Sequence, residues 1–255
     1  MNEIGKIKKD LFLVLELDDS KILEYHFDLI EKSKNDGDFR AVSFNTLRMR
    51  FLLHKLTKLK KLKPKNFNLH KNDLLSQKDT DGFYGFRFEV DIAFSLLEKG
   101  IDFEKSERPD FKLDLKGKNL FIECTSVRSR GGNTDYGNLK KKVIDTIGGK
   151  EAKPYSNSVT ILAIDVTNVF YNVKPENWQT FYDELFEHVK KHSKDDKYGA
   201  ILMFVTVFSQ KTNQIKSTFC RTNSENIDED LKAFVEKYFP YRKDSIKAPA
   251  IPKES

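Results

Sequence analysis

The sequence predicts an α/β protein with a mixed central β-sheet flanked by helices and with a helical N-terminal region. Up to residue 80, apolar side chains recur mainly at the three-to-four spacing that is typical of amphipathic helices. Beyond that point helical patterns alternate with short strand patterns, the order expected of an α/β domain. Two of the strand segments, 159–166 and 200–208, are nearly continuous apolar runs, as expected for strands covered on both faces.

We divide the chain into three parts. Residues 1–80 form the helical N-terminal region, residues 81–240 form the α/β core, and residues 241–255 form a flexible tail. A chain of this length is expected to hold one large domain, or one domain with a helical appendage.

The N-terminal region is expected to contain two clear helices. Ser20 is placed to cap the first of them, and the second spans 39–62 and is ended by Pro64. The apolar run 11–17 fits either a strand or the beginning of a helix, because short apolar runs do not separate the two.

The core is expected to alternate helices with strands. Gly100 ends its first helix, and the glycine pair at 148 and 149 ends its second. The remaining elements follow from apolar periodicity. The expected helices span 84–99, 137–147, 176–191 and 228–238, and the expected strands span 101–104, 110–115, 119–127, 159–166, 200–208 and 214–221.

Composition and charge limit the class of protein. Of 255 residues 38% are hydrophobic and 21 are Phe, which excludes a wholly disordered chain. No apolar stretch reaches the ~20 residues that span a bilayer, and the N-terminus lacks the apolar core of a secretory signal. We therefore expect a soluble, cytoplasmic protein without a membrane partner. The net charge of +6 permits a polyanionic partner but does not establish one.

The segment 108–127 brings two acidic residues together. Gly117 and the lysine before it lie between two alternating runs and predict a tight hairpin turn. With the turn centred there, Leu113 pairs with Leu120 and Asp110 pairs with Glu123. Directly opposed residues of an antiparallel pair project from the same face, so the two carboxylates are expected to lie close together.

Opposed like charges are unfavourable unless a cation or protons neutralise them. Magnesium takes oxygen ligands and usually combines one or two carboxylates with waters and phosphate oxygens, so Asp110 and Glu123 are candidate magnesium ligands. The alternative is a salt-bridged or partly protonated pair at a solvated strand edge.

A third acid, Glu89, favours the metal site. On the helix 84–99, Glu89 shares one apolar stripe with Phe86, Val90 and Ala93, so its carboxylate is expected to face inward. A carboxylate in an apolar stripe is unfavourable unless it is paired, hydrogen-bonded or metal-bound. The alternative is a core glutamate that bonds to backbone or water.

Together these residues resemble the PD-(D/E)XK phosphodiesterase superfamily, the family with the restriction-endonuclease-like fold. The resemblance rests on inward Glu89, on the string PD that ends at Asp110, and on the string ECT from Glu123 to Thr125. These motifs fall on a helix, a strand and the adjacent strand, and the resemblance covers residues 84–166.

The resemblance implies a mixed sheet flanked by helices and a metal-dependent cleavage of DNA, less often of RNA. It also implies that Asp110 and Glu123 bind Mg²⁺, with Mn²⁺ as the alternative ion, and that Glu89 binds the ion directly or through water.

Thr125 departs from this pattern, because the family usually has a lysine at that position. On the helix 137–147 the apolar stripe contains Lys140, whereas Lys141 points away. Lys140 is therefore our candidate for the catalytic cation, with a solvated basic run as the alternative. Lys150 would extend the stripe only if the helix continued beyond the glycine pair.

Three further basic residues are candidates for contact with a nucleic-acid backbone. Arg128 and Arg130 follow the acidic strand, and Lys141 points away from the core. An ordinary surface loop is equally consistent with the two arginines.

Two functions follow as hypotheses. The first is a magnesium-dependent nuclease that hydrolyses phosphodiester bonds, expected to be a DNA endonuclease of the restriction or defence type. Its helical N-terminal part would contact nucleic acid or form a homodimer. The second is a catalytically inactive nucleic-acid-binding or scaffold module that keeps the nuclease fold, and Thr125 is the residue that favours it.

Overall fold

The computed structural model describes residues 3–77, 82–115, 117–128, 135–192, 197–209 and 214–240. Two compact units divide the chain: residues Met1–Lys105 with Gln210–Ile215, and residues Ser106–Ser209 with Lys216–Ser255. The tail expected over 241–255 lies outside the described residues. None of the described helices is long and apolar enough to cross a membrane.

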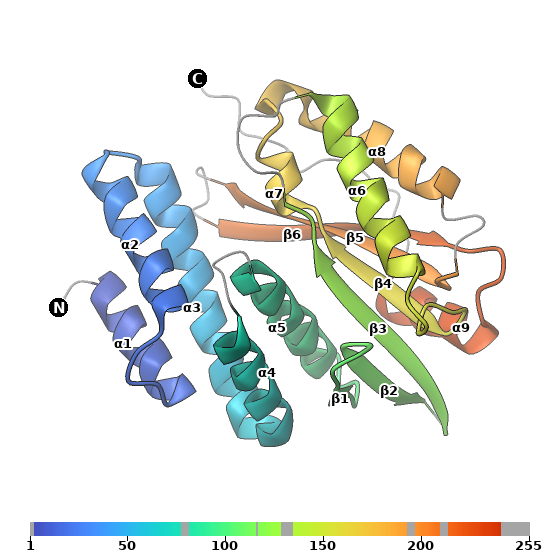
Figure 1. Ribbon diagram of the computed structural model, residues 1–255, viewed down its shortest axis with the longest axis horizontal. Coiled ribbons are helices and arrows are strands. Elements are labelled where there is room, and N and C mark those ends of the chain that lie inside the picture. The colour runs from blue at the N-terminus through green and yellow to red at the C-terminus, as the bar shows by residue number, and fades with distance from the viewer. Residues whose placement is uncertain are drawn as a thin grey trace. The chain divides into compact units, whose positions relative to one another are not determined.

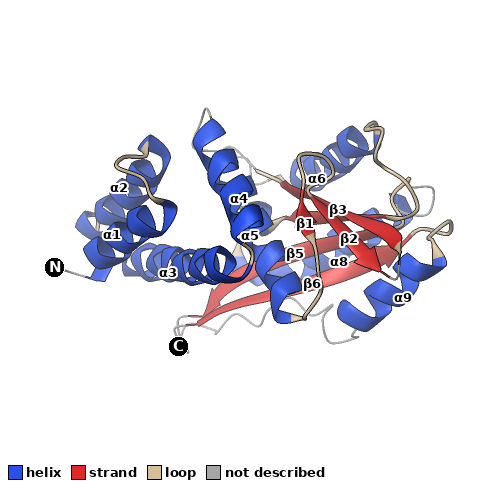
Figure 2. Cartoon of the chain, turned by 90° about the horizontal axis from the view of Figure 1, so that it is seen from below, coloured by secondary structure: helices blue, strands red, loops and turns tan. Residues whose placement is uncertain are grey.

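The first unit is built from helices, which are blue in Figure 2. They are α1 (Glu3–Leu15), α2 (Lys21–Asn35), α3 (Phe39–Leu62), α4 (Pro64–Ser76) and α5 (Gly82–Glu98), and the short strand β1 (Glu104–Lys105) follows them. Ser20 caps α2 by accepting a hydrogen bond from the backbone N–H of Leu23, as predicted. The prediction of a helix over 39–62 is also confirmed by α3. The ambiguous run 11–17 belongs largely to α1.

Helix α5 belongs to the first unit, although the sequence suggested a boundary near residue 80. The reason is that α5 packs against α3 and α4. Its expected apolar stripe is buried, since Phe86, Val90 and Ala93 are at most 2% exposed. Arg87, which does not belong to this stripe, is also buried, with 6% exposure.

The second unit combines a sheet with covering helices (Figure 1). Its strands are β2 (Phe111–Leu115), β3 (Lys118–Ser126), β4 (Thr160–Asp165), β5 (Ala200–Ser209) and β6 (Gln214–Asn223). Its helices are α6 (Tyr136–Glu151), α7 (Thr167–Phe170), the 3₁₀ helix η1 (Pro175–Asn177), α8 (Trp178–His192) and α9 (Glu229–Tyr238). Strand β2 is antiparallel to β3, whereas β4 is parallel to β3 and β5 is parallel to β4. The protein is thus mixed α/β with a six-stranded mixed sheet, as predicted.

The β2–β3 hairpin has the register that the turn residues predicted. Phe111 pairs with Ile122, and Leu113 pairs with Leu120. Gly117 has a φ of +85°, the left-handed conformation that glycine adopts without a steric penalty. The turn at Gly117 therefore fixes the register of the whole hairpin, including the end that carries Asp110 and Glu123.

Helices α6 and α8 pack over the sheet face that carries Glu123. Leu162 and Ile164 of β4 pair with Glu123 and Thr125 of β3, so the four side chains share one face. Leu162 and Ile164 form one apolar core with the buried residues of α6, α7 and α8. Glu123 therefore lies at the edge of an apolar layer, where water has little access.

Gly199 and Gly148 allow a matched pair of stability tests. A Cβ added at Gly199, just before β5, would lie 2.2 Å from the carbonyl oxygen of Ser158, whereas a Cβ at Gly148 would meet nothing within 4 Å. We expect Gly199→Ala to lower the free energy of unfolding by about 2–3 kcal/mol through overpacking. We expect Gly148→Ala to raise it by roughly 0.5–1 kcal/mol, because alanine is the better helix former. Urea denaturation measures both changes in the free energy of unfolding. If both substitutions changed it in the same direction, the close packing at Gly199 or the open space at Gly148 would be contradicted.

Candidate active site

Two buried carboxylates lie beside each other across the β2–β3 hairpin. Asp110 directly precedes β2 and is 9% exposed, and Glu123 lies within β3 and is 3% exposed. Oδ2 of Asp110 accepts a hydrogen bond of 2.6 Å from the backbone N–H of Cys124, the residue after Glu123. This bond holds the Asp110 carboxylate against β3, next to the glutamate that the hairpin register places opposite it.

Glu123 uses one of its two carboxylate oxygens for hydrogen bonds. Nζ of Lys150 lies 2.5 Å from Oε1, and the hydroxyl group of Tyr155 donates to the same oxygen at 3.0 Å. Oε2 is buried and has no hydrogen-bond partner among the described residues. A buried carboxylate oxygen without a partner is unfavourable, so this atom is positioned to bind a cation or a proton donor.

Tyr155 remains a hydrogen-bond donor because of its surroundings. Burial, followed by the negative charge of Glu123, raises the pKa of Tyr155 to about 12. Arg108 acts in the opposite direction on this pKa, and Asp110 raises it further. The charges of Asp110, Glu123 and Arg108 therefore all act at one hydroxyl group, as expected if they belong to a single site.

Lys150 reaches Glu123 because α6 does not end at the glycine pair. The helix continues through Gly148 and Gly149 to Glu151, so the prediction of a helix end at these residues is wrong. The buried residues Leu139, Val143 and Ile147 anchor α6, and Lys150 follows on the same stripe. The hydroxyl group of Tyr198 also donates a hydrogen bond of 3.0 Å to the carbonyl oxygen of Lys150. Tertiary contacts thus outweigh the low helix propensity of two glycines.

Lys140 has a different partner from the one expected. Its Nζ lies 2.7 Å from a carboxylate oxygen of Glu184 on α8, and its side chain is 22% exposed. The lysine of α6 that contacts Glu123 is Lys150. The three-to-four spacing places both lysines near the same stripe of α6. They have different partners because Lys140 lies beside α8, whereas Lys150 lies near the end of α6, beside β3.

Thr125 lies on β3 two residues beyond Glu123, is half-buried, and pairs with Ile164. The sequence interpretation missed Lys150 and Tyr155 as members of the site. A signal for Lys150 was present in its spacing from Val143 and Ile147, but the glycines before it argued for a helix end. Tyr155 lies in the connection to β4, where no periodicity could indicate its direction.

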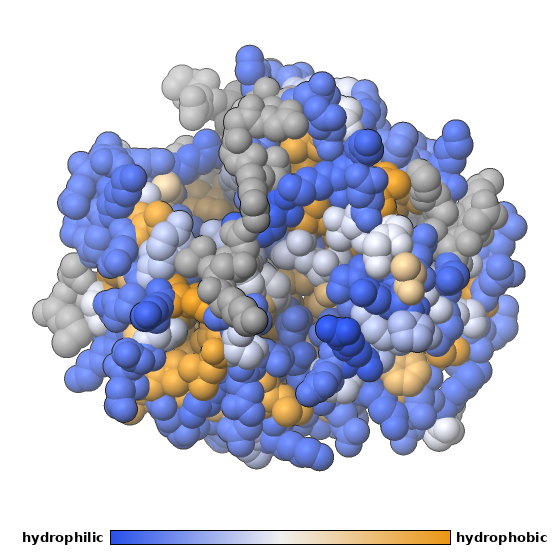
Figure 3. All heavy atoms as spheres, viewed as in Figure 1, coloured by the Kyte–Doolittle hydropathy of each residue, from blue (hydrophilic) through white to orange (hydrophobic). Residues whose placement is uncertain are grey.

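The predicted nucleic-acid contacts are placed only in part. Arg128 follows β3 and is half-buried, Lys141 is exposed on α6, and Arg130 lies outside the described residues. Hydrophilic side chains cover much of the face shown in Figure 3. Several lysines pair with carboxylates, as Lys118 does with Asp228. The net charge of the chain therefore does not by itself mark a binding surface.

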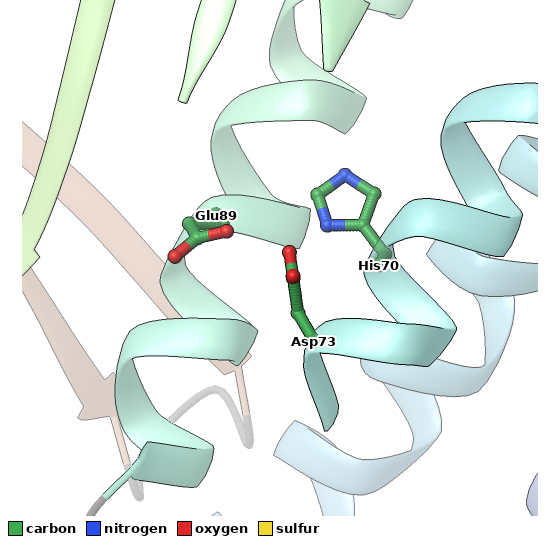
Figure 4. Close-up of side chains that lie close together, drawn as sticks. All are labelled: His70, Asp73 and Glu89. Atoms are coloured by element: carbon green, nitrogen blue, oxygen red, sulfur yellow. The ribbon is translucent and has the colours of Figure 1, made fainter. Parts of the chain in front are cut away.

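Glu89 takes part in a separate cluster inside the first unit. His70 and Asp73 of α4 and Glu89 of α5 point toward one another, as Figure 4 shows. Nζ of Lys105 lies 2.8 Å from a carboxylate oxygen of Glu89 and 3.0 Å from one of Asp73. The glutamate that the sequence predicted to face inward is thus part of an ion-pair network around the buried side chain of Lys105.

The same cluster has the residue types of a metal site. His70, Asp73 and Glu89 offer three ligand atoms within 4.8 Å of one another. Burial, and then the charge of Lys105, lowers the pKa of His70 to about 3, so the ring is neutral. A divalent ion would nevertheless have to displace the ammonium group of Lys105, whose side chain is 4% exposed. We conclude that Lys105 supplies the cation for these carboxylates.

Lys105→Met is expected to lower the free energy of unfolding by about 3 kcal/mol. The substitution removes the buried ammonium group that pairs with Glu89, whose side chain is 18% exposed, and breaking such an ion pair is strongly destabilising. The side chain of Asp73 is 40% exposed, so water compensates for most of the ion pair that Asp73 loses with Lys105.

Lys63→Met is the control for this prediction. Its partner Asp102 is 80% exposed, so we expect a change below ~1 kcal/mol. Urea denaturation of both variants measures the difference, and equal losses would contradict a buried ion pair at Lys105.

The fold and the site define a mixed α/β protein with a buried pair of carboxylates and a helix-borne lysine on one sheet face. Comparison with protein-family models, with curated proteins and with solved structures finds no match to this chain.

Proposed function

We propose that the protein is a magnesium-dependent nuclease that hydrolyses phosphodiester bonds, with DNA as the expected substrate. The observation that carries the proposal is the contact of Lys150 with Glu123, beside Asp110. Two acids and a lysine thus lie together although Thr125 occupies the position where a lysine was expected. The resemblance to the PD-(D/E)XK superfamily supports the same activity, with the lysine supplied by a helix.

The carboxylates fit a magnesium ion. Asp110 and Glu123 would hold it, since Mg²⁺ binds through one or two carboxylates and completes its shell with water and phosphate oxygens. The buried oxygen Oε2 of Glu123, which has no hydrogen-bond partner among the described residues, is a free acceptor for the ion. Mn²⁺ has the same preference for oxygen ligands and is the alternative. A bound ion would supply Lewis-acid activation of a phosphate and of a water molecule.

The residues of the chain have separate roles in this proposal. Lys150 places a positive charge where negative charge develops on the phosphate during hydrolysis, which lowers the energy of the transition state. Tyr155 holds Oε1 of Glu123, so the other oxygen keeps one orientation. The backbone N–H of Cys124 does the same for Asp110. Both carboxylates are therefore oriented before substrate binds, which avoids reorganisation during the reaction.

A second candidate function is a catalytically inactive nucleic-acid-binding or scaffold module. The observation that favours it is Thr125, together with the bond from Lys150 to Glu123, because a lysine can neutralise a buried carboxylate without any catalytic role.

Cleavage assays with the purified chain decide between the two functions. Supercoiled plasmid, linear DNA and RNA are incubated with Mg²⁺, with Mn²⁺ or with excess chelator. Cleavage that requires the divalent ion supports the nuclease and identifies its substrate. Nucleic-acid binding without cleavage in any of these conditions supports the inactive module and overturns the nuclease.

A further inference from the structure

Two tyrosines of the second unit hold the two members of the contact between Lys150 and Glu123. The hydroxyl group of Tyr155, in the connection between α6 and β4, donates to Oε1 of Glu123 at 3.0 Å. That of Tyr198, which lies just before β5, donates to the carbonyl oxygen of Lys150 at 3.0 Å. One tyrosine thus fixes the acid through its side chain, and the other fixes the lysine through its backbone.

The carbonyl group of Lys150 lies at the end of α6, where the helical hydrogen bonds end. The last four carbonyl groups of an α-helix have no partner within it, and α6 ends at Glu151. The backbone N–H of Lys153 donates to the Lys150 oxygen at 3.0 Å, and Tyr198 bonds to the same oxygen from a position 48 residues away in the chain. A carbonyl oxygen has two lone pairs, so both bonds can form together. The bond from Tyr198 therefore ties the end of α6 that carries the ammonium group to the start of β5.

Thr160 connects the backbones of the two tyrosines. It is the first residue of β4 and is fully buried. Its hydroxyl group donates a hydrogen bond of 3.0 Å to the carbonyl oxygen of Tyr155. Its own carbonyl oxygen accepts one of 3.0 Å from the backbone N–H of Gly199, the residue after Tyr198. Since Tyr198 is also fully buried, the hydroxyl groups of the two tyrosines are held in a fixed relation to each other.

The hydroxyl group of Tyr198 keeps its proton and stays a hydrogen-bond donor. Burial, and next the negative charge of Glu123, raises the pKa of Tyr198 above its ordinary value. The charge of Glu123 thus acts at the hydroxyl groups of both tyrosines. A donor at this place matches the carbonyl oxygen of Lys150, which can only accept.

We propose that Tyr198 is a positioning residue, which determines where Lys150 places its ammonium group beside Glu123. The inference deepens the proposed function and rests on it for its consequence, since Lys150 is the cation that would stabilise charge on the phosphate. Such stabilisation depends on close placement, because a displacement of about 1 Å can cost on the order of 10²-fold in rate. Tyr198 would contribute to the rate through the backbone of Lys150 and needs no contact with the substrate.

Amine labelling of Lys150 tests the positioning without a cleavage assay. The full chain is treated with acetic anhydride, and the initial rate of acetylation of each lysine is measured by mass spectrometry. Tyr198→Phe keeps the buried ring but removes the hydroxyl group, so Lys150 should be acetylated about 5-fold faster, the size expected for loss of one hydrogen bond. Lys140 is the internal control on the same helix, with a side chain 22% exposed against 26% for Lys150, and its rate should not change.

Steady-state cleavage with Mg²⁺ measures the consequence for the proposed reaction. Tyr198→Phe should lower kcat by about 3- to 10-fold and change KM by less than about twofold, because a displaced cation affects the transition state more than substrate binding. A loss of stability alone would reduce the folded fraction, which melting curves measure, and would leave kcat per folded molecule unchanged.

Two further variants separate positioning from a general loss of packing. The hydroxyl group of Tyr171 accepts a hydrogen bond of 3.2 Å from the backbone N–H of Phe208 on β5, so Tyr171→Phe is the matched control and should leave Lys150 acetylation and kcat unchanged. Gly148→Ala strengthens the end of α6, and its Cβ meets nothing within 4 Å. In the Tyr198→Phe background it should restore part of both measurements.

The outcomes distinguish this inference from the proposed function. Equal acetylation of Lys150 in the wild-type chain and in Tyr198→Phe, or the same increase in Tyr171→Phe, would overturn the positioning role. Magnesium-dependent cleavage with an unchanged kcat in Tyr198→Phe would also overturn it, while the nuclease would stand. A wild-type chain that does not cleave would overturn the nuclease only, and faster acetylation of Lys150 in Tyr198→Phe would still support positioning by Tyr198.

Discussion

Asp110→Asn and Glu123→Gln are each expected to reduce magnesium-dependent cleavage by on the order of 10³-fold or more. Each change removes one of the two negative charges that would hold the ion, and with it both metal affinity and the stabilisation of charge on the phosphate. Nucleic-acid binding should persist, because the basic residues are unchanged. Initial cleavage rates over a range of Mg²⁺ concentrations, measured beside binding of the same DNA, test this prediction.

Asp114→Asn is the matched control for these variants. Asp114 lies on β2, is exposed, and uses Oδ1 to accept a hydrogen bond of 2.9 Å from the backbone N–H of Gly117 in the turn. Its cleavage rate should stay close to wild type. Melting curves test whether Glu123→Gln folds, because this substitution leaves the ammonium group of Lys150 beside a neutral amide. Full cleavage activity in both Asp110→Asn and Glu123→Gln would contradict a role of these carboxylates in the reaction.

Lys150→Ala should lower the cleavage rate by about 10²–10³-fold with little change in DNA affinity. The reason is that a positioned cation near the phosphate interacts more strongly with the transition state than with the substrate. Lys140→Ala removes the same charge from the same helix but breaks a contact with Glu184, so its rate should remain within about twofold of wild type. Single-turnover rates at saturating DNA separate the rate from affinity.

A second substitution tests whether the position of the charge matters. Thr125 lies on β3 two residues beyond Glu123, on the same face of the sheet. Thr125→Lys in the Lys150→Ala background therefore returns a lysine to the site, now from the strand instead of the helix. We expect partial recovery of the rate. Equal cleavage rates for Lys140→Ala and Lys150→Ala would contradict the proposed role of Lys150. If both variants also cleaved as fast as the wild-type chain, the contact between Lys150 and Glu123 would be a structural ion pair only.

The sequence predicts the hairpin and its acids well because the controlling interactions are local. A turn at Gly117 and strict alternation on both strands determine which residues oppose one another, so the buried neighbours Asp110 and Glu123 could be inferred without the fold. The helix over 39–62 is predictable for the same reason, since its periodicity is long and it ends at a proline.

The partners of the charged residues could not be predicted. The spacing on α6 indicates which face a lysine occupies, but Glu184 and Glu123 come from elements 44 and 27 residues away in the chain. The inward direction of Glu89 was likewise visible in the sequence, whereas its pairing with Lys105 depends on where β1 passes α4 and α5. Long-range packing, which local patterns do not encode, decides these contacts.

The last turn of α6 joins the proposed chemistry to local opening of a helix. Two glycines raise the conformational entropy that this turn loses on folding, by roughly 1 kcal/mol each relative to alanine. The hydrogen bond from Tyr198 to the carbonyl oxygen of Lys150 opposes that loss. Unwinding of one terminal turn requires less free energy than global unfolding, and it withdraws the ammonium group from Glu123 while the sheet stays intact. Heat should therefore inactivate the site reversibly below the temperature at which the sheet melts.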